Sequence, residues 1–171
     1  KALKVDKKSR VRYLSDSEEA SLRTALVNRE EHRRMKRESG TRWREVRGYD
    51  PVEHVEDPED YLKPIVLLAL NTGMRRGELF SLRWVDVDLG RRQLTIVGAD
   101  AKSEQTRYID LNREAYTLLV EWQKRWGNYQ LVFPNPNTGE QFDNIKSAWN
   151  GLRETAGLKN FRFHDLRHSF A

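Results

Sequence analysis

Three short segments of the sequence place ionisable side chains where they could do chemistry, and the first is TGMRRGEL at positions 72–79. An Asn-Thr-Gly run at 71–73 is a helix-stop signature, and a new helix is expected to begin near Arg76. Arg75 therefore lies at a turn, where its guanidinium can point into a cleft and bind two phosphate oxygens through its planar fork. Glu78, three residues further on, is placed to orient Arg75. The alternative interpretation is a surface arginine paired with a glutamate.

The second segment is HDLRH at positions 164–168. His164 and Arg167 are three residues apart and share a helix face, while Leu166 and Phe170 are expected on the opposite, buried face. A histidine beside an arginine can bind a phosphate and assist proton movement near neutral pH. One alternative is a pair of structural histidines.

A metal site is a further alternative, because His164 and His168 are spaced i, i+4 and HDxxH resembles the HExxH of zinc proteases. Asp replaces the Glu of that motif, and Arg167 would put a cation beside the metal ion. We therefore predict no metal ligands.

The third segment is a polar turn that contains Lys102, between two strand-like stretches. A flexible ammonium on such a loop could reach a DNA groove and donate a proton to a leaving oxygen. A lysine in a polar turn is commonplace, so this feature alone has no functional meaning.

Taken together and in this order, the three segments resemble the tyrosine recombinase family, the phage-integrase type of DNA strand transferase. TGMRRGELFSLRWVDVDL resembles the family's box around its first active-site arginine, AKSEQTRYIDLN its β-hairpin lysine segment, and HDLRHSFA its His-x-x-Arg box. The similarity extends from about residue 14 to residue 171 and is weakest over the charged stretch 29–51. It implies site-specific DNA recombination, integration or excision through a 3′-phosphotyrosyl intermediate that stores the bond energy without ATP.

The resemblance also implies a role for each matching residue. Arg75 and Arg167 would bind the phosphate, Lys102 would be the general acid for the leaving 5′-hydroxyl, and His164 would be a phosphate ligand and proton-transfer partner. Glu78 would support Arg75, and His168 matches a position that is usually structural. Two guanidiniums can neutralise the charge that builds up on a pentavalent phosphorus, so no cofactor is expected.

The family's nucleophile, a tyrosine downstream of the His-x-x-Arg box, has no counterpart in these residues. All six tyrosines precede the box: Tyr13, Tyr49, Tyr61, Tyr108, Tyr116 and Tyr129. The family's later His or Trp ligand and its upstream core-binding domain are also missing. We therefore expect part of a catalytic domain that cannot cut DNA by itself, from a protein that continues beyond Ala171.

The elements that must position these residues form a mainly α-helical domain with a small antiparallel β-sheet, the tyrosine recombinase catalytic-domain fold. One expected helix begins at the Ser15-x-x-Glu18 capping box and buries Leu22, Ala25 and Leu26, and a second begins at Asp57-Pro58 and includes the apolar run 65–70. A third spans 76–82, and a fourth begins at Asn112 and buries Ala115, Leu118, Leu119, Trp122 and Trp126. A fifth spans 144–156 and is stopped by Gly157, and the last begins near Phe163. Pro64 is expected to bend its helix or delay its start. Strands are expected at 93–97 and 107–111, forming a hairpin.

The charge distribution adds an anionic partner to this interpretation. Residues 1–50 carry 15 Lys and Arg against 9 Asp and Glu, whereas the remainder carries 16 against 17. We interpret 1–13 as a basic linker or arm, 14–171 as the catalytic domain, and 29–51 as a charged extension or insertion. A charge run alone is more often a solvated helix. With the motifs beside it, we predict DNA contacts from Arg33, Arg34, Arg37 and Arg76.

Several classes of protein are excluded or disfavoured. The absence of cysteine removes disulfides, thiolate zinc sites and a cysteine nucleophile, and no apolar run approaches the roughly 20 residues of a membrane span. We expect a cytoplasmic, nucleoid-associated protein of a prokaryote or phage that binds double-stranded DNA and self-assembles on it, as a tetramer in the family. No membrane and no small-molecule substrate are expected. The rival functions are a non-catalytic DNA-binding or regulatory module with the same fold, and a metal-dependent hydrolase using His164 and His168.

Overall fold

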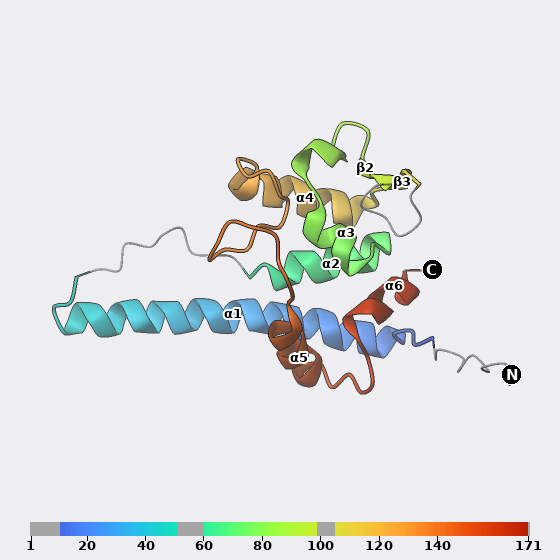
Figure 1. Ribbon diagram of the computed structural model, residues 1–171. Coiled ribbons are helices and arrows are strands. Elements are labelled where there is room, and N and C mark those ends of the chain that lie inside the picture. Colours follow the sequence, from blue (N-terminus) through green and yellow to red (C-terminus); the bar gives the residue numbers. More distant parts are fainter. Residues whose placement is uncertain (1–10, 51–59, 99–104, 171) are drawn as a thin grey trace, which may run out of the picture.

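The computed structural model describes residues 11–50, 60–98 and 105–170, and helices dominate it (Figure 1). The α-helices are α1 (Asp16–Val46), α2 (Leu62–Thr72), α3 (Arg76–Ser81), α4 (Arg113–Trp126), α5 (Lys146–Thr155) and α6 (Leu166–Ser169). The strands are β1 (Val87–Asp88), β2 (Gln93–Ile96) and β3 (Arg107–Asp110), in one antiparallel sheet of order β1-β2-β3. The predicted fold class, mainly α with a small antiparallel sheet, is confirmed.

Helix α1 begins as the sequence predicts. The backbone N–H of Glu18 donates to the Ser15 hydroxyl at 3.2 Å, and the Ser15 N–H donates to the Glu18 carboxylate at 3.0 Å, which is a complete capping box. Leu22, Ala25 and Leu26 are the buried side chains of this helix. The helix then continues through the charged stretch to Val46, so most of the predicted extension is a helical continuation of α1.

Helix α2 is the centre of the core, with nearly all of its side chains buried. It begins at Leu62, and Pro64 lies in its first turn, where a missing N–H costs no helical hydrogen bond. The late start expected from Pro64 is therefore confirmed, whereas the predicted Asp57-Pro58 cap lies outside the described residues. The helix ends at Gly73, whose φ of 60° is the left-handed conformation that stops helices.

The end of α2 is tied to the start of α4 by polar side chains. The Asn71 amide donates to the Glu114 carboxylate at 2.8 Å, and Asn112 donates to the Asn71 oxygen at 2.6 Å. Asn112 also caps α4, because its side chain accepts from the N–H of Ala115 at 2.9 Å. The segment that follows Gly73 therefore starts from a fixed position.

β2 and β3 form the predicted hairpin, and the sheet has one further strand, β1, that the sequence did not indicate. β2 and β3 pair with Leu94 opposite Ile109 and Ile96 opposite Arg107, while β1 pairs Val87 with Leu94. A two-residue strand is too short to show the alternation by which strands are predicted.

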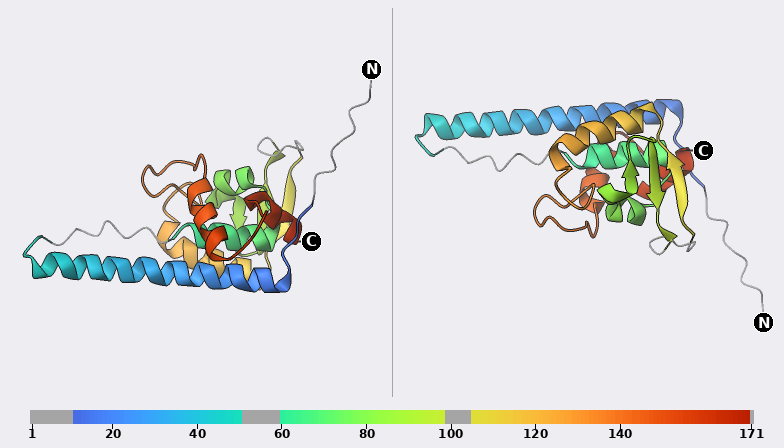
Figure 2. Two further views of the ribbon diagram at one scale, coloured as in Figure 1. Left: turned by 90° about the horizontal axis from the view of Figure 1, so that it is seen from below. Right: turned by 90° about the horizontal axis from the view of Figure 1, so that it is seen from above.

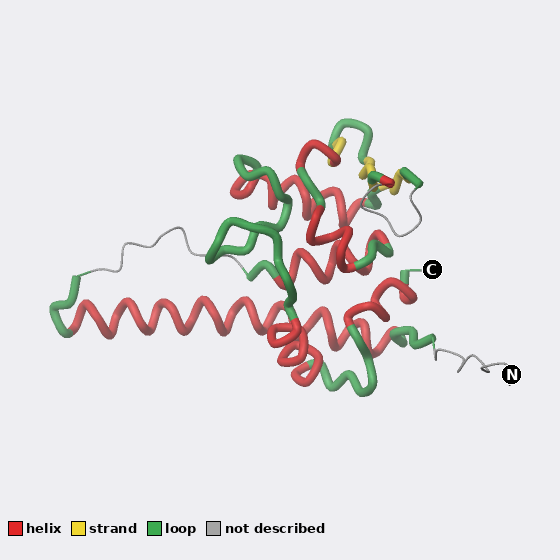
Figure 3. The backbone as a smooth tube through the Cα atoms, in the orientation of Figure 1, coloured by secondary structure: helices red, strands yellow, loops and turns green. Residues whose placement is uncertain are grey.

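The connection from α4 to α5 is irregular but anchored (Figure 3). Its Val132 N–H donates to the carbonyl of Leu82 at 2.8 Å, and the indole N–H of Trp122 donates to the carbonyl of Val132 at 2.6 Å. α5 then packs on α1.

The last helix packs against α2, and the N-terminal segment packs against the last helix. The Leu14 N–H donates to the Ser169 hydroxyl at 3.0 Å, and the Tyr13 ring lies 6.3 Å from that of His168. Leu166 is fully buried as predicted, but the prediction for Phe170 is wrong, because its side chain is 49% exposed. The Phe170 ring lies close to Gly73.

The described elements form a compact body from which α1 projects. Figure 1 shows α6, β3 and the end of α2 at one end of the molecule, and the C-terminal part of α1 extending past the opposite end. Both views in Figure 2 show the same projection. This arrangement separates Arg75 and Arg167 from the arginines at 33, 34 and 37, whose relative positions the sequence alone could not give.

Candidate active site

A buried carboxylate organises the candidate site. The Glu78 side chain is only 2% exposed, and it accepts a hydrogen bond from the Arg75 backbone N–H at 2.7 Å and from the Arg75 guanidinium at 3.0 Å. Arg75 precedes the first residue of α3, and its extended backbone turns the chain from α2 into that helix. Glu78 is therefore in direct contact with Arg75, where the sequence predicts that it orients the guanidinium.

A second arginine, Arg107 of β3, reaches the same carboxylate. Its two terminal nitrogens lie 3.0 and 2.6 Å from the two carboxylate oxygens of Glu78. Burial alone would raise the pKa of Glu78, but the hydrogen bonds from Arg107 and from the backbone and side chain of Arg75 outweigh it and hold that pKa below its ordinary value. Glu78 is therefore a carboxylate at neutral pH.

Arg167, from the far end of the chain, lies near Arg75, Glu78 and Arg107, and we call these four residues the cationic cluster. Its guanidinium donates a hydrogen bond to the carbonyl of Gly73, in the turn just before Arg75. Burial and the nearby positive charge of Arg75 lower the pKa of Arg167, and Glu78 opposes this effect. The two arginines predicted to bind phosphate thus lie together, 92 positions apart in the sequence.

His164 lies beside Arg167 on the segment that leads into α6. Partial burial and the positive charges of His168 and Arg167 lower the pKa of His164. The His164 and His168 rings are 5.6 Å apart and perpendicular. A lowered pKa favours the neutral imidazole near pH 7, which can accept a proton or donate a hydrogen bond.

Asp165 fixes the turn that presents His164. Its side chain is 1% exposed and accepts from the Arg162 N–H at 2.8 Å and from the Arg162 guanidinium at 3.1 Å. Burial works against ionisation of Asp165, but these hydrogen bonds keep its pKa below the ordinary value. Asp165 therefore has a structural role in holding the His-x-x-Arg segment.

The remaining predicted site residues lie in different places. Lys102 lies outside the described residues. Arg76 is exposed on the first turn of α3, next to Arg75. The arginines predicted at 33, 34 and 37 lie in the C-terminal half of α1 and are not brought to the cluster.

Arg33 and Arg34 lie close to carboxylates. Arg33 lies 4.0 Å from the buried carboxylate of Asp60, which also accepts from Arg29 at 2.5 Å, and Arg34 lies 3.7 Å from Glu38. Asp60 precedes α2, while Arg75 follows it, and an 11-residue helix is about 16 Å long. Any DNA contact by these arginines is therefore distant from the cluster.

Arg107 is a residue of the candidate site that the sequence motifs do not single out. It stands within the quoted segment AKSEQTRYIDLN, but its partner Glu78 is 29 positions earlier. The signal that was available is the position itself: an arginine at the start of a strand, in the segment that resembles the family's lysine hairpin.

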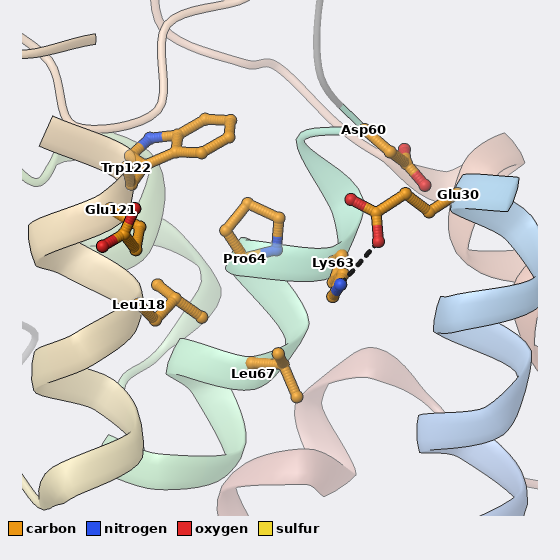
Figure 4. Close-up of a pocket in the computed structure, with 8 residues that line it drawn as sticks. All are labelled: Glu30, Asp60, Lys63, Pro64, Leu67, Leu118, Glu121 and Trp122. Carbon is orange, nitrogen blue, oxygen red and sulfur yellow. Dashed lines mark hydrogen bonds and ion pairs between the residues drawn. The ribbon is translucent and has the colours of Figure 1, made fainter. Parts of the chain in front are cut away.

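A separate pocket of about 290 Å³ lies at the other end of α2, between α1, α2 and α4 (Figure 4). Pro64, Leu67, Leu118 and Trp122 form its apolar part, and Figure 4 shows Lys63 paired with Glu30 at its edge. Three carboxylates line it, those of Glu30, Asp60 and Glu121. Its acidic lining does not suit a phosphate, so the cationic cluster is the better candidate for binding DNA.

Within residues 11–50, 60–98 and 105–170, no group of three or more His, Cys, Asp or Glu side chains could hold a metal ion. The same residues include no helix long and apolar enough to cross a membrane.

Comparison with known proteins identifies the family. The family model described as "Phage integrase family" matches residues 52–171, more than half of the chain. The chain belongs to the phage integrase family, the class to which the fold and the cluster also point.

A characterised relative agrees with this assignment. The chain is 32% identical over 130 residues to the integrase of Salmonella phage P22, covering 68% of this chain and 33% of that protein.

Two solved structures share its fold. The Tn1549 transposon integrase in complex with circular intermediate DNA matches with a TM-score of 0.65 and 16% identity, over 96% of this chain and 54% of that one. A lambda integrase tetramer bound to a Holliday junction matches with a TM-score of 0.60 and 19% identity, over 95% and 43%. The chain thus spans about a third to a half of the length of these proteins, and its fold is that of the tyrosine recombinase catalytic domain.

Proposed function

We propose that this chain is part of a tyrosine recombinase that cuts and rejoins DNA at specific sites. The observation that carries the proposal is the convergence of Arg75 and Arg167, two guanidiniums from distant segments, around the turn at Gly73. Two positive charges held without an equal number of carboxylates form a receptor for a phosphodiester. Membership of the phage integrase family and the fold shared with DNA-bound integrases support the same conclusion.

The proposed reaction is the cleavage and rejoining of a DNA phosphodiester, with the positive side chains of the cluster around the phosphate. A tyrosine oxygen attacks the scissile phosphorus, a 3′-phosphotyrosyl bond forms, and the bond to the 5′-oxygen breaks. Arg75 and Arg167 stabilise the charge on the non-bridging oxygens, and His164 hydrogen-bonds to the phosphate and exchanges a proton. Lys102 protonates the leaving 5′-oxygen. Attack of that 5′-hydroxyl on the phosphotyrosine reverses each step and rejoins the strand.

None of the six tyrosines in these 171 residues follows the His-x-x-Arg segment, which is where this proposal needs its nucleophile. The partner is double-stranded DNA in the cytoplasm of a prokaryote, bound by several copies of the full-length protein. The tetrameric assembly of lambda integrase on a Holliday junction supports this arrangement. Arg76, exposed beside the cluster, is placed to contact the phosphates that flank the scissile one.

The test uses the full-length protein and a suicide substrate, a DNA site with a nick that prevents rejoining, so that the covalent complex accumulates. Arg75→Ala and Arg167→Ala should each lower the single-turnover rate of covalent complex formation by about 100-fold or more, while affinity for DNA changes far less. Arg91→Ala is the control, because the Arg91 side chain is 84% exposed and pairs only loosely with Asp88. If both cluster variants cleave at the control's rate, the proposed site is wrong.

The 171-residue chain alone should form no covalent complex with the same substrate, because it lacks the attacking tyrosine. Denaturing electrophoresis of the reaction shows this directly. A covalent band would mean that one of the six tyrosines in this chain is the nucleophile.

A further inference from the structure

Arg107 contacts Glu78 more closely than Arg75 does. Its two terminal nitrogens engage both carboxylate oxygens, whereas Arg75 donates through one terminal nitrogen and its backbone N–H. A bidentate pair of this kind is the strongest geometry between a guanidinium and a carboxylate. Both terminal nitrogens of Arg107 thus bind Glu78, whereas Arg75 uses only one of its two terminal nitrogens for this carboxylate.

The net charge of the cluster also depends on Arg107. Glu78 alone would cancel the charge of Arg75, and the phosphate would face one net positive charge, that of Arg167. With Arg107 included, one carboxylate lies among three guanidiniums, and the net charge is two. Arg107 therefore offsets the carboxylate that is needed to orient Arg75.

The strand fixes the position of Arg107. Arg107 pairs with Ile96 across the β2–β3 ladder, and Glu78, Ile96 and Val97 line one small cavity. The ion pair thereby fastens the start of β3 to the first turn of α3.

We propose that Arg107 is a positioning residue: it holds Glu78 in place and ionised, so that the guanidinium of Arg75 stays oriented with its charge available to the scissile phosphate. This inference rests on the proposed recombinase function and deepens it. Arg107 is assigned no contact with the phosphate itself.

The charged groups around Glu78 come from four elements. They are Arg75 in the turn before α3, Arg107 on β3, Arg167 on α6, and Asp86, which lines the same small cavity. When Arg107 is removed, burial still opposes ionisation of Glu78, and only the hydrogen bonds from Arg75 remain to favour it. The pKa of Glu78 should then rise, and Arg75 should lose its anchor as the pH falls.

The experiment measures single-turnover cleavage of the suicide substrate by the full-length protein between pH 5.5 and pH 8. Arg107→Met should lower the cleavage rate at pH 8 by about 10- to 100-fold, the usual consequence of a displaced catalytic group, with the Kd for DNA within about threefold of the original. Arg107→Lys keeps the charge but loses the fork, and should recover a large part of the rate. Arg91→Met removes a charge from the exposed turn between β1 and β2 and should cleave at the original rate.

The pH profile separates positioning from a structural role. The deficit of Arg107→Met should grow as the pH falls, because Glu78 takes up a proton. In the double variant Arg107→Met with Glu78→Gln, this extra loss at low pH should disappear, since glutamine does not titrate. If Arg107→Met does not fold, as judged by circular dichroism, Arg107→Gln carries the same prediction.

Two results overturn the inference: cleavage by the uncharged Arg107 variants within about twofold of the original, or a loss that is equal at every pH. The proposed function is tested separately by Arg75→Ala and Arg167→Ala in the same assay. If those two fail to impair cleavage, the function is wrong; if they impair it and Arg107 does not, only the role of Arg107 is wrong.

Discussion

At the scale of single residues, carboxylates fix the arginines in this chain. Glu78 holds Arg75 and Arg107, Asp165 holds Arg162, and Glu18 holds Arg12. Each carboxylate has its pKa lowered by the hydrogen bonds it accepts. Acid should therefore weaken the fold and the site through the same kind of contact.

Glu18 gives a prediction for stability. Hydrogen bonds from the Arg12 guanidinium and the Ser15 N–H lower the pKa of Glu18 from 4.5 to about 2. Because the pKa is lower in the folded state, this contribution is complete well above pH 4.5 and is lost as the pH falls toward 2. Glu18→Gln should cost about 1 kcal/mol at pH 7, a value reduced for solvent exposure, and almost nothing at pH 2.

Urea unfolding at the two pH values checks this prediction. Glu38→Gln, which alters the exposed pair with Arg34, should change little at either pH. An equal cost of Glu18→Gln at both pH values would show that the ionised carboxylate is not the source.

At the scale of elements, the end of α2 matters most, because it places Arg75 and accepts the hydrogen bond of Arg167. Gly73 has a φ of 60°, and a Cβ there would lie 2.7 Å from a ring carbon of Phe170. Glycine is needed at this position for two reasons, its conformation and the close approach of the last helix.

Gly73→Ala should therefore destabilise the protein by more than the roughly 1 kcal/mol of a left-handed alanine. It should also slow cleavage, because α6 must move away and take Arg167 with it. Gly139→Ala is a matched control: its φ is 74°, and a Cβ there would have no neighbour within 4 Å. Thermal unfolding of both variants measures the difference, and equal losses would contradict the proposed clash.

The sequence predicts those elements whose signals are local. The capping box of α1, the Asn112 cap and the stop at Gly73 depend on residues within one helical turn, as does the contact of Glu78 with Arg75. The continuation of α1 to Val46 could not be predicted, because its Met35, Trp43 and Val46 side chains are exposed and show no buried face. The contact of Arg107 with Glu78 depends on how the sheet lies against α3, which no spacing reveals.

At the scale of the whole molecule, the cationic cluster and the arginines of α1 lie toward opposite ends. Arg33, Arg34 and Arg37 would therefore contact DNA far from the scissile phosphate, and they would contact only its sugar-phosphate backbone. Arg34 is the most exposed of the three, whereas Arg33 faces Asp60.

Replacing Arg34 with glutamine should weaken binding to every DNA sequence to a similar extent. The slope of log K against log salt should fall by about 0.9 for one lost phosphate contact, and the same change at Arg33 should have a smaller effect. Binding titrations on specific and unrelated duplexes between low and moderate salt check this. A loss confined to one DNA sequence would contradict backbone contact.

The central claim is that the guanidiniums near Gly73 neutralise the scissile phosphate. The most direct measurement compares cleavage by Arg167→Ala on an ordinary suicide substrate and on one whose scissile phosphate is a neutral methylphosphonate. A phosphate without the negative charge needs less neutralisation, so the deficit of Arg167→Ala relative to the original protein should shrink by about 10-fold or more on the neutral substrate. An equal deficit on both substrates would show that Arg167 does not act on the phosphate charge.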